Sequence, residues 1–144
     1  MDLVAHAGVV IRAPRSAVWR ALLAPESIPR ILPVTEVVEP WRLGRRFVWT
    51  FQLAEVEARV EGRVQRVEVE QLLEYDYVDP HSLHVLRKSN VHGVLIELSD
   101  HELGTQVTVT QDANLSAAAH AHAEGGWRLA LANLKELVER APRE

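Results

Sequence analysis

The sequence contains no cysteine among its 144 residues. It cannot form disulfide bonds, use a thiolate nucleophile, or hold zinc or an iron–sulfur cluster through cysteine ligands. Long apolar runs are also lacking, since no stretch approaches the roughly 20 apolar residues of a membrane span, and no secretory leader precedes Ile11. We therefore expect a cytoplasmic protein without a membrane span.

Positive charge is not in excess, because 16 lysine and arginine residues face 20 aspartate and glutamate residues, for a net charge of -4. This balance offers no broad basic surface, so a nucleic-acid partner is not expected. The sequence also lacks a Gly-x-Ser-x-Gly elbow, a glycine-rich phosphate loop and a dinucleotide fingerprint. These gaps exclude the commonest hydrolases, kinases and dehydrogenases, and we expect no cofactor.

Apolar residues make up 47% of the chain, which is enough for a core without metal or disulfide support. The length suits one domain over residues 1–144. The β-branched segment Leu3 to Ile11 predicts a strand, and Pro14 suits the first turn of a following helix. A second short helix fits between Glu26 and Leu32, before an extended piece from Val34 to Glu39.

From Gly44 onward, apolar side chains recur at every second residue, which is typical of strands with one buried face. The parity of this pattern changes near Gln65 and Arg66, so we expect a β-bulge that bends the sheet there. Further strands are expected through Tyr75 and Tyr77 and over residues 91–99 and 105–112, the last two joined by a turn at residues 100–104. Residues 79–90 show no period and are expected to form a loop.

The chain ends in an expected amphipathic helix, with Trp127, Leu131, Leu134 and Val138 on one stripe. Gly125 and Gly126 mark either a kink in this helix or its start.

Several short strings in this order resemble one family. The strings are Ile11-Arg12-Ala13-Pro14 with Val18-Trp19-Arg20-Ala21-Leu22, Gly44-Arg45-Arg46-Phe47, Glu61-Gly62-Arg63-Val64, Gly104-Thr105-Gln106-Val107-Thr108-Val109, and Gly126-Trp127 with Leu131 and Leu134. Together they resemble the SRPBCC superfamily, also called START or birch-pollen-allergen-like, in the branch named for activators of the heat-shock-protein-90 ATPase. The resemblance implies an α+β helix-grip fold, in which a curved antiparallel sheet of six or seven strands wraps around a long C-terminal helix.

The resemblance also implies a cavity between sheet and helix that holds a small hydrophobic or amphipathic ligand, although large side chains could instead fill this space. The expected ligand-binding residues are Phe47, Trp49, Phe51, Tyr75, Tyr77, Ile96, Leu98, Trp127, Leu131 and Leu134. Family members differ in function, so two alternatives stay open: a polyketide cyclase-like enzyme using the same cavity, and a chaperone-activator domain. A homodimer is a further open alternative.

No convincing metal or catalytic group accompanies these residues. His120 and His122 would project about 200 degrees apart on a helix, and His81, His84, His92 and His101 follow no ligand pattern. If Tyr75 and Tyr77 point inward, Glu74 and Asp76 point outward, and Glu97 lies opposite Ile96. Arg42, Arg45 and Arg46 are read as a solvated turn, which leaves the tyrosine hydroxyls as the polar groups inside.

Overall fold

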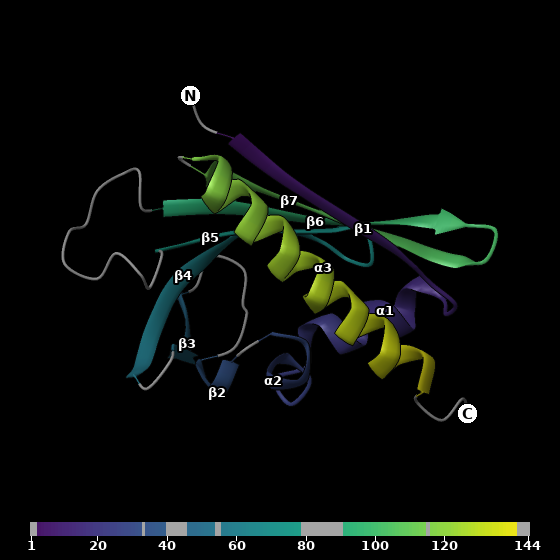
Figure 1. The fold of residues 1–144 in the computed structure, drawn as a ribbon. Helices are drawn as coiled ribbons and strands as arrows, with labels where there is room; N and C mark the ends of the chain where they lie inside the picture. The colour runs from purple at the N-terminus through teal and green to yellow at the C-terminus, as the bar shows by residue number, and fades with distance from the viewer. Residues whose placement is uncertain are drawn as a thin grey trace.

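The computed structural model describes residues 3–32, 34–39, 46–53, 56–78, 91–114 and 116–140. Its elements are β1 (Leu3–Ile11), α1 (Arg15–Leu23), α2 (Ile28–Ile31), β2 (Val34–Glu39), β3 (Arg46–Leu53), β4 (Val56–Glu68), β5 (Leu72–Val78), β6 (Val91–His101), β7 (Gly104–Asn114) and α3 (Ala117–Arg140). The seven strands form one antiparallel sheet in the order β1-β7-β6-β5-β4-β3-β2. Helix α3 crosses one face of this sheet diagonally, with α1 and α2 beside its C-terminal half (Figure 1). The predicted helix-grip fold is therefore confirmed.

The sheet bends where the sequence changes parity. The pairing of β4 with β5 shifts register between Val64 and Arg66, which confirms the predicted bulge. A bulge increases the local twist of a strand. In Figure 1, β3 and β4 accordingly turn steeply away from the direction of β6 and β7, which gives the sheet its curved inner face.

Two predicted boundaries differ from the structure, and the sequence leaves a third open between two alternatives. The turn between β6 and β7 is shorter than residues 100–104, because the strands continue to His101 and from Gly104, and the His101 Nδ1 atom accepts a hydrogen bond from the Leu103 N–H at 3.1 Å. Helix α2 covers only Ile28–Ile31. Helix α3 begins at Ala117, where the Ser116 hydroxyl oxygen accepts from the Ala119 N–H at 3.1 Å, so the glycine pair lies inside the helix and does not start it.

A close approach between two backbone segments at the start of β7 explains why the sequence has Gly104 before Thr105. Gly104 has a φ of 147°, and a Cβ at this position would lie 2.2 Å from the Ile11 carbonyl oxygen, so only glycine fits. The buried Thr105 hydroxyl then donates to the Ala13 carbonyl oxygen at 2.8 Å. The start of β7 is thus fixed to the corner between β1 and α1.

Helix α3 covers the edge strand β1 with polar side chains. His120 Nε2 lies 3.1 Å from the Val4 carbonyl oxygen, and a Glu124 carboxylate oxygen accepts from the His6 N–H at 3.0 Å. Toward the other end, Lys135 Nζ donates to the Val10 carbonyl oxygen at 2.9 Å. A Glu139 carboxylate oxygen there accepts from the Arg12 N–H at 2.9 Å. These side chains bind edge groups that would otherwise face solvent or another strand.

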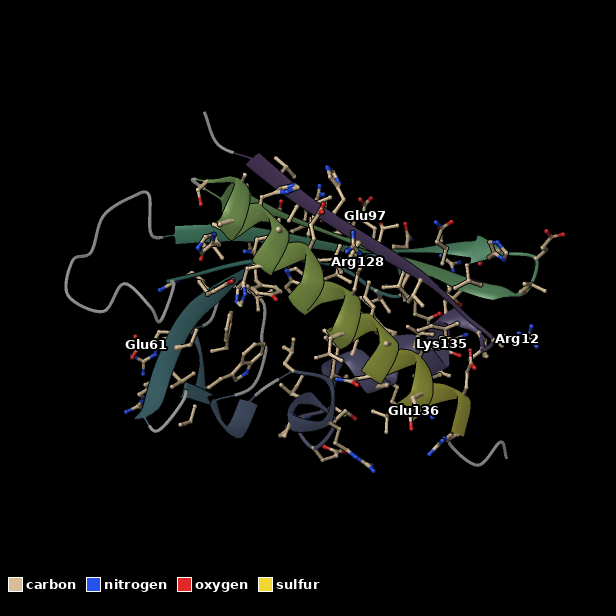
Figure 2. All side chains as sticks on the ribbon, in the orientation of Figure 1. Arg12, Glu61, Glu97, Arg128, Lys135 and Glu136 are labelled. Carbon is tan, nitrogen blue, oxygen red and sulfur yellow. The ribbon has the colours of Figure 1, made fainter. Side chains whose placement is uncertain are left out.

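Figure 2 shows Lys135 beside Arg12 where α3 passes the end of β1. Within the described residues, neither α3 nor the two shorter helices is long and apolar enough to cross a bilayer.

Candidate ligand cavity

A small cavity lies between the sheet, the α1–α2 segment and α3. Its volume is about 20 Å³. The lining residues are Leu22, Ile28, Ile31, Leu32, Tyr75, Ile96, Val109, Trp127, Ala130, Leu131 and Leu134. A buried water needs roughly 10–15 Å³ and two to four polar partners, and an apolar wall does not supply these partners. In this state the cavity is therefore a small, apolar space.

Aromatic side chains from β3 and β5 form a wall behind this cavity. The ring centroids of Phe47 and Trp49 are 4.7 Å apart, and Tyr75 meets Phe47 edge-on at 5.4 Å. The Tyr75 and Tyr77 centroids are 6.3 Å apart, and Tyr77 lies 5.4 Å from the His92 ring of β6. Such offset and edge-on contacts are the favoured arrangements of aromatic pairs, so this side of the cavity is closely packed.

Beside the lining residues Val109 and Trp127, a polar cluster forms around Gln111 of β7, and we call this cluster the polar end. The Gln111 Oε1 atom accepts hydrogen bonds from Trp127 Nε1 at 2.8 Å and from the Tyr77 hydroxyl at 3.2 Å. Gln111 is buried and lies two residues after Val109, on the same face of β7. One carboxamide oxygen thus joins β5, β7 and α3.

His92 lies next to this polar end and is buried. Its Nδ1 atom lies 3.0 Å from the Asp112 carbonyl oxygen. A carbonyl oxygen can only accept, so Nδ1 carries a proton in this contact.

Burial determines the titration of Tyr75. Its removal from water raises the pKa of the phenol well above 10.0, and the neighbouring Tyr77 raises the pKa further. The hydroxyl of Tyr75 is therefore neutral at every physiological pH and acts as a hydrogen-bonding group, not as a phenolate.

The ten sequence-predicted binding residues fall into three groups. Tyr75, Ile96, Trp127, Leu131 and Leu134 line the cavity. Phe47, Trp49 and Leu98 are buried in the surrounding core, and Tyr77 packs against that core and reaches the polar end. The side chain of Phe51 lies outside the described residues. Whether any of these residues contacts a ligand stays a prediction.

The sequence pattern did not predict the lining residues of the α1–α2 segment, which are Leu22, Ile28, Ile31 and Leu32. The prolines in this segment interrupt the apolar periodicity that would indicate which side chains point inward. Gln111 was also not predicted, although the alternation of Val107 and Val109 already places Gln111 on the buried face of β7.

The carboxylates near the tyrosines point away from the cavity, as their strand parity predicts. Asp76 accepts a hydrogen bond from Gln65 Nε2 at 2.9 Å, Glu74 lies 3.8 Å from Arg66, and Glu97 is exposed. Among the described residues, no three histidine, aspartate or glutamate side chains are placed to hold a metal ion. His81, His84, Arg42 and Arg45 lie outside the described part of the chain, and Arg46 pairs with Glu61 at 3.7 Å.

Comparison with known proteins places this fold in a family. The family described as "Activator of Hsp90 ATPase homolog 1-like protein" matches residues 12–139. A protein from Cytophaga hutchinsonii is 31% identical, with a TM-score of 0.81 over 95% of this chain and 94% of that chain. Protein CV1439 from Chromobacterium violaceum is 21% identical, with a TM-score of 0.79 over 96% and 99% of the two chains.

The allergen-named structure Ara h 8.0201 is 12% identical, with a TM-score of 0.76 over 96% and 98% of the two chains, and shares the fold alone. A search of curated proteins found no match. The family match covers most of the chain, and the sheet order and long last helix agree with it. The chain therefore belongs to the activator of Hsp90 ATPase homolog 1-like family, within the SRPBCC helix-grip superfamily.

Proposed function

We propose that this protein binds a small hydrophobic or amphipathic molecule between the sheet and α3. The observation that carries this proposal is the apolar cavity bounded by Tyr75, Ile96 and Trp127, with an aromatic wall behind it. Pockets for small molecules are usually concave and apolar, with a few polar groups at fixed positions. The polar end at Gln111 lies beside the lining residues Val109 and Trp127 and would supply such groups to a ligand that widens the cavity.

Binding requires the cavity to widen, because about 20 Å³ is too small for an organic ligand. Trp127 is the large lining side chain best suited to move, since it is only partly buried. It also follows Gly125 and Gly126, and glycine lowers helix stability. A ligand admitted by this movement would pack between the indole ring of Trp127 and the side chains of Leu131 and Leu134.

Substitution of Trp127 by alanine tests the proposal. We expect 2-ethylnaphthalene, a neutral apolar probe, to raise the melting temperature of the wild-type protein but not that of Trp127→Ala. The matched control is Leu129→Ala on the same helix, because Leu129 is 64% exposed. Circular dichroism checks that both variants are folded. An equal thermal shift in wild type and Trp127→Ala would contradict the assignment of the cavity as the binding site.

A cyclase-like enzyme is the second candidate, and His92 is the observation that favours it. Histidine often acts as a general acid or base, and the ring of His92 lies 5.4 Å from that of Tyr77. Loss of turnover in Tyr77→Phe or His92→Gln, with probe binding retained, would support this candidate. Turnover unchanged in both variants would exclude these side chains from catalysis.

The family description also suggests a chaperone partner. Co-purification with an Hsp90-type chaperone would support that role. A pull-down without such a partner would count against it.

A further inference from the structure

Helix α2 and the residue that follows it form one wall of the cavity. Ile28, Ile31 and Leu32 line this wall, and the first two of these side chains are buried. In Figure 1, α2 lies beside α3, between the end of α1 and β2. Movement of this one short segment would therefore open the cavity along its border with α3.

The other walls of the cavity are held more firmly. Strands β5, β6 and β7 each have a paired strand on both sides, so none of them can move aside without breaking backbone hydrogen bonds. Helix α3 is bound to the backbone of β1 in both of its halves, by Glu124 in one and by Glu139 in the other. Helix α1 follows the corner that the buried Thr105 hydroxyl fixes. These elements leave α2 as the part of the wall most free to move.

Few interactions hold α2 in place. It is a single turn of four residues with Pro29 inside it, and a helix this short depends on packing more than on its own hydrogen bonds. The side chain of its N-cap residue, Ser27, makes no capping hydrogen bond. Among the described residues, one hydrogen bond joins α2 to another element, because Asn133 Nδ2 of α3 donates to the Ile31 carbonyl oxygen at 3.1 Å.

This hydrogen bond lies at the border of the cavity. Asn133 precedes the lining residue Leu134 on α3, and its acceptor belongs to the lining residue Ile31. Asn133 is half-buried, so water can hydrate both groups when the bond breaks, and the net cost of breaking it is modest. The apolar side chains of Ile28 and Ile31 favour closure, because opening exposes them to water.

We propose that α2 is a lid over the cavity and that Asn133 is the latch that holds it closed. A hydrophobic molecule passes between α2 and α3 while the hydrogen bond from Asn133 to Ile31 is broken, and the bond forms again once the molecule is inside. The inference rests on the proposed function, because it describes how the ligand of the same cavity enters. Movement of Trp127 makes room inside the cavity, and movement of α2 gives access to it.

Asn133→Ala tests the latch in stopped-flow fluorescence measurements with 2-ethylnaphthalene. Loss of one neutral hydrogen bond should raise the population of the open lid about 5-fold, so association and dissociation should both become about 5-fold faster. The Kd should not change, because the latch is closed both with and without the ligand. A side chain that only stabilises the fold would lower the melting temperature and leave both rates as they are.

Lys135→Met is the matched control on the same helix. It removes a hydrogen bond from α3 to another backbone carbonyl oxygen, that of Val10 in β1, and does not touch α2. Its association and dissociation rates should equal those of the wild-type protein. Equal acceleration by Lys135→Met and Asn133→Ala would show that α3 moves and α2 does not.

A second measurement keeps the latch and closes the lid covalently, in case Asn133→Ala does not fold. The chain has no cysteine, so Arg30→Cys/Glu136→Cys can be joined specifically by a short bismaleimide after folding. Both positions are exposed, Arg30 on α2 and Glu136 one turn after Asn133 on α3. Cross-linking should slow both association and dissociation relative to the same variant before cross-linking.

Three results would overturn the inference while the proposed function stands. They are unchanged rates in folded Asn133→Ala, equal acceleration by Lys135→Met, and a cross-linked protein that binds and releases the probe as fast as before. If 2-ethylnaphthalene does not bind the wild-type protein at all, the proposed function fails and this inference falls with it.

Discussion

Tyr75 occupies the centre of the aromatic wall and contacts rings on both sides. Its centroid lies 5.4 Å from that of Phe47 and 6.4 Å from that of Trp49. Desolvation is the first cause of its raised pKa and Tyr77 the second. Because the folded protein binds the phenol proton more tightly than the unfolded chain does, this group stabilises the folded state fully below pH 10.0. The contribution is lost as the pH rises above that value.

An alkaline titration checks the burial of Tyr75. The chain has two tyrosines, so its phenolate absorbance contains at most two steps. We expect the step of Tyr75 to occur well above pH 10.0, together with alkaline unfolding, because the buried phenolate would lose its hydration. Tyr75→Phe should remove this step alone. Ionisation of both tyrosines near pH 10.0 in the folded protein would show that the wall admits water.

Strand parity predicts whether an individual side chain points inward or outward. It does not predict the hydrogen-bond partners of a side chain that lies where several elements meet. The inward direction of Tyr75 and the outward direction of Asp76 follow from alternation along β5. The hydrogen bonds of Gln111 could not be predicted, because they join residues 34 and 16 positions apart in sequence. No local pattern specifies which donors will reach a buried carboxamide.

At the scale of elements, the contact between β1 and α3 depends on two carboxylates with lowered pKa values. The hydrogen bond from the Arg12 N–H is the main cause that lowers the pKa of Glu139, followed by the hydrogen bond from Lys135. The His6 N–H is the main cause for Glu124, where His120, Arg128 and His6 also lower the pKa through their charge. Both carboxylates therefore favour the folded state when ionised.

Acid should weaken this contact between helix and edge strand. A lowered folded pKa contributes stability that is complete above the unfolded value of 4.5 and is lost as the pH falls through the folded value. We expect Glu124→Gln/Glu139→Gln to melt at a lower temperature than wild type near neutral pH, and the difference to vanish in acid. Glu136→Gln is the matched control, because Glu136 lies on the exposed side of α3 and pairs only with Arg140 among the described residues. An equal loss at all pH values would contradict this account.

The elements themselves were mostly predictable, because hydrophobic periodicity reports them directly. The strand from Leu3 to Ile11 and the bulge at Gln65 follow from β-branched content and a change of parity. The glycine pair left the start of the last helix open between two alternatives, and the capping of Ala119 by Ser116 places the pair inside the helix. Residues 79–90, expected to form a loop or an irregular edge, lie outside the described residues.

At the scale of the whole molecule, the main finding is that the cavity formed by the described residues of the sheet and the helices is small. The resemblance to a ligand-binding superfamily left open whether the space between sheet and α3 is a cavity or a packed core. The structure gives a cavity of about 20 Å³ with fully packed neighbours. Periodicity could not predict this volume, because it depends on how side chains from three elements interlock.

A mutation that enlarges the cavity should therefore lower the free energy of unfolding. A ligand that fills the enlarged cavity should restore part of this loss. Leu134 lines the cavity and is 1% exposed, so Leu134→Ala should lower the free energy of unfolding by about 2–5 kcal/mol in urea. The enlarged apolar space should bind benzene and recover part of this loss. Leu129→Ala, on the exposed side of α3, should change stability by no more than about 0.5 kcal/mol. A cost as small as this for Leu134→Ala would show that the core collapses around the missing side chain.

Gly125 and Gly126 lie in the turn of α3 just before Trp127. A Cβ at either position would meet no atom from other parts of the fold within 4 Å. Each glycine lowers helix stability by about 1 kcal/mol relative to alanine, although no packing requires it. Trp127, which lines the cavity, thus follows a turn of α3 that two glycines make less stable. We therefore expect these two glycines to affect how fast a ligand enters the cavity, and not how tightly the lining residues hold it.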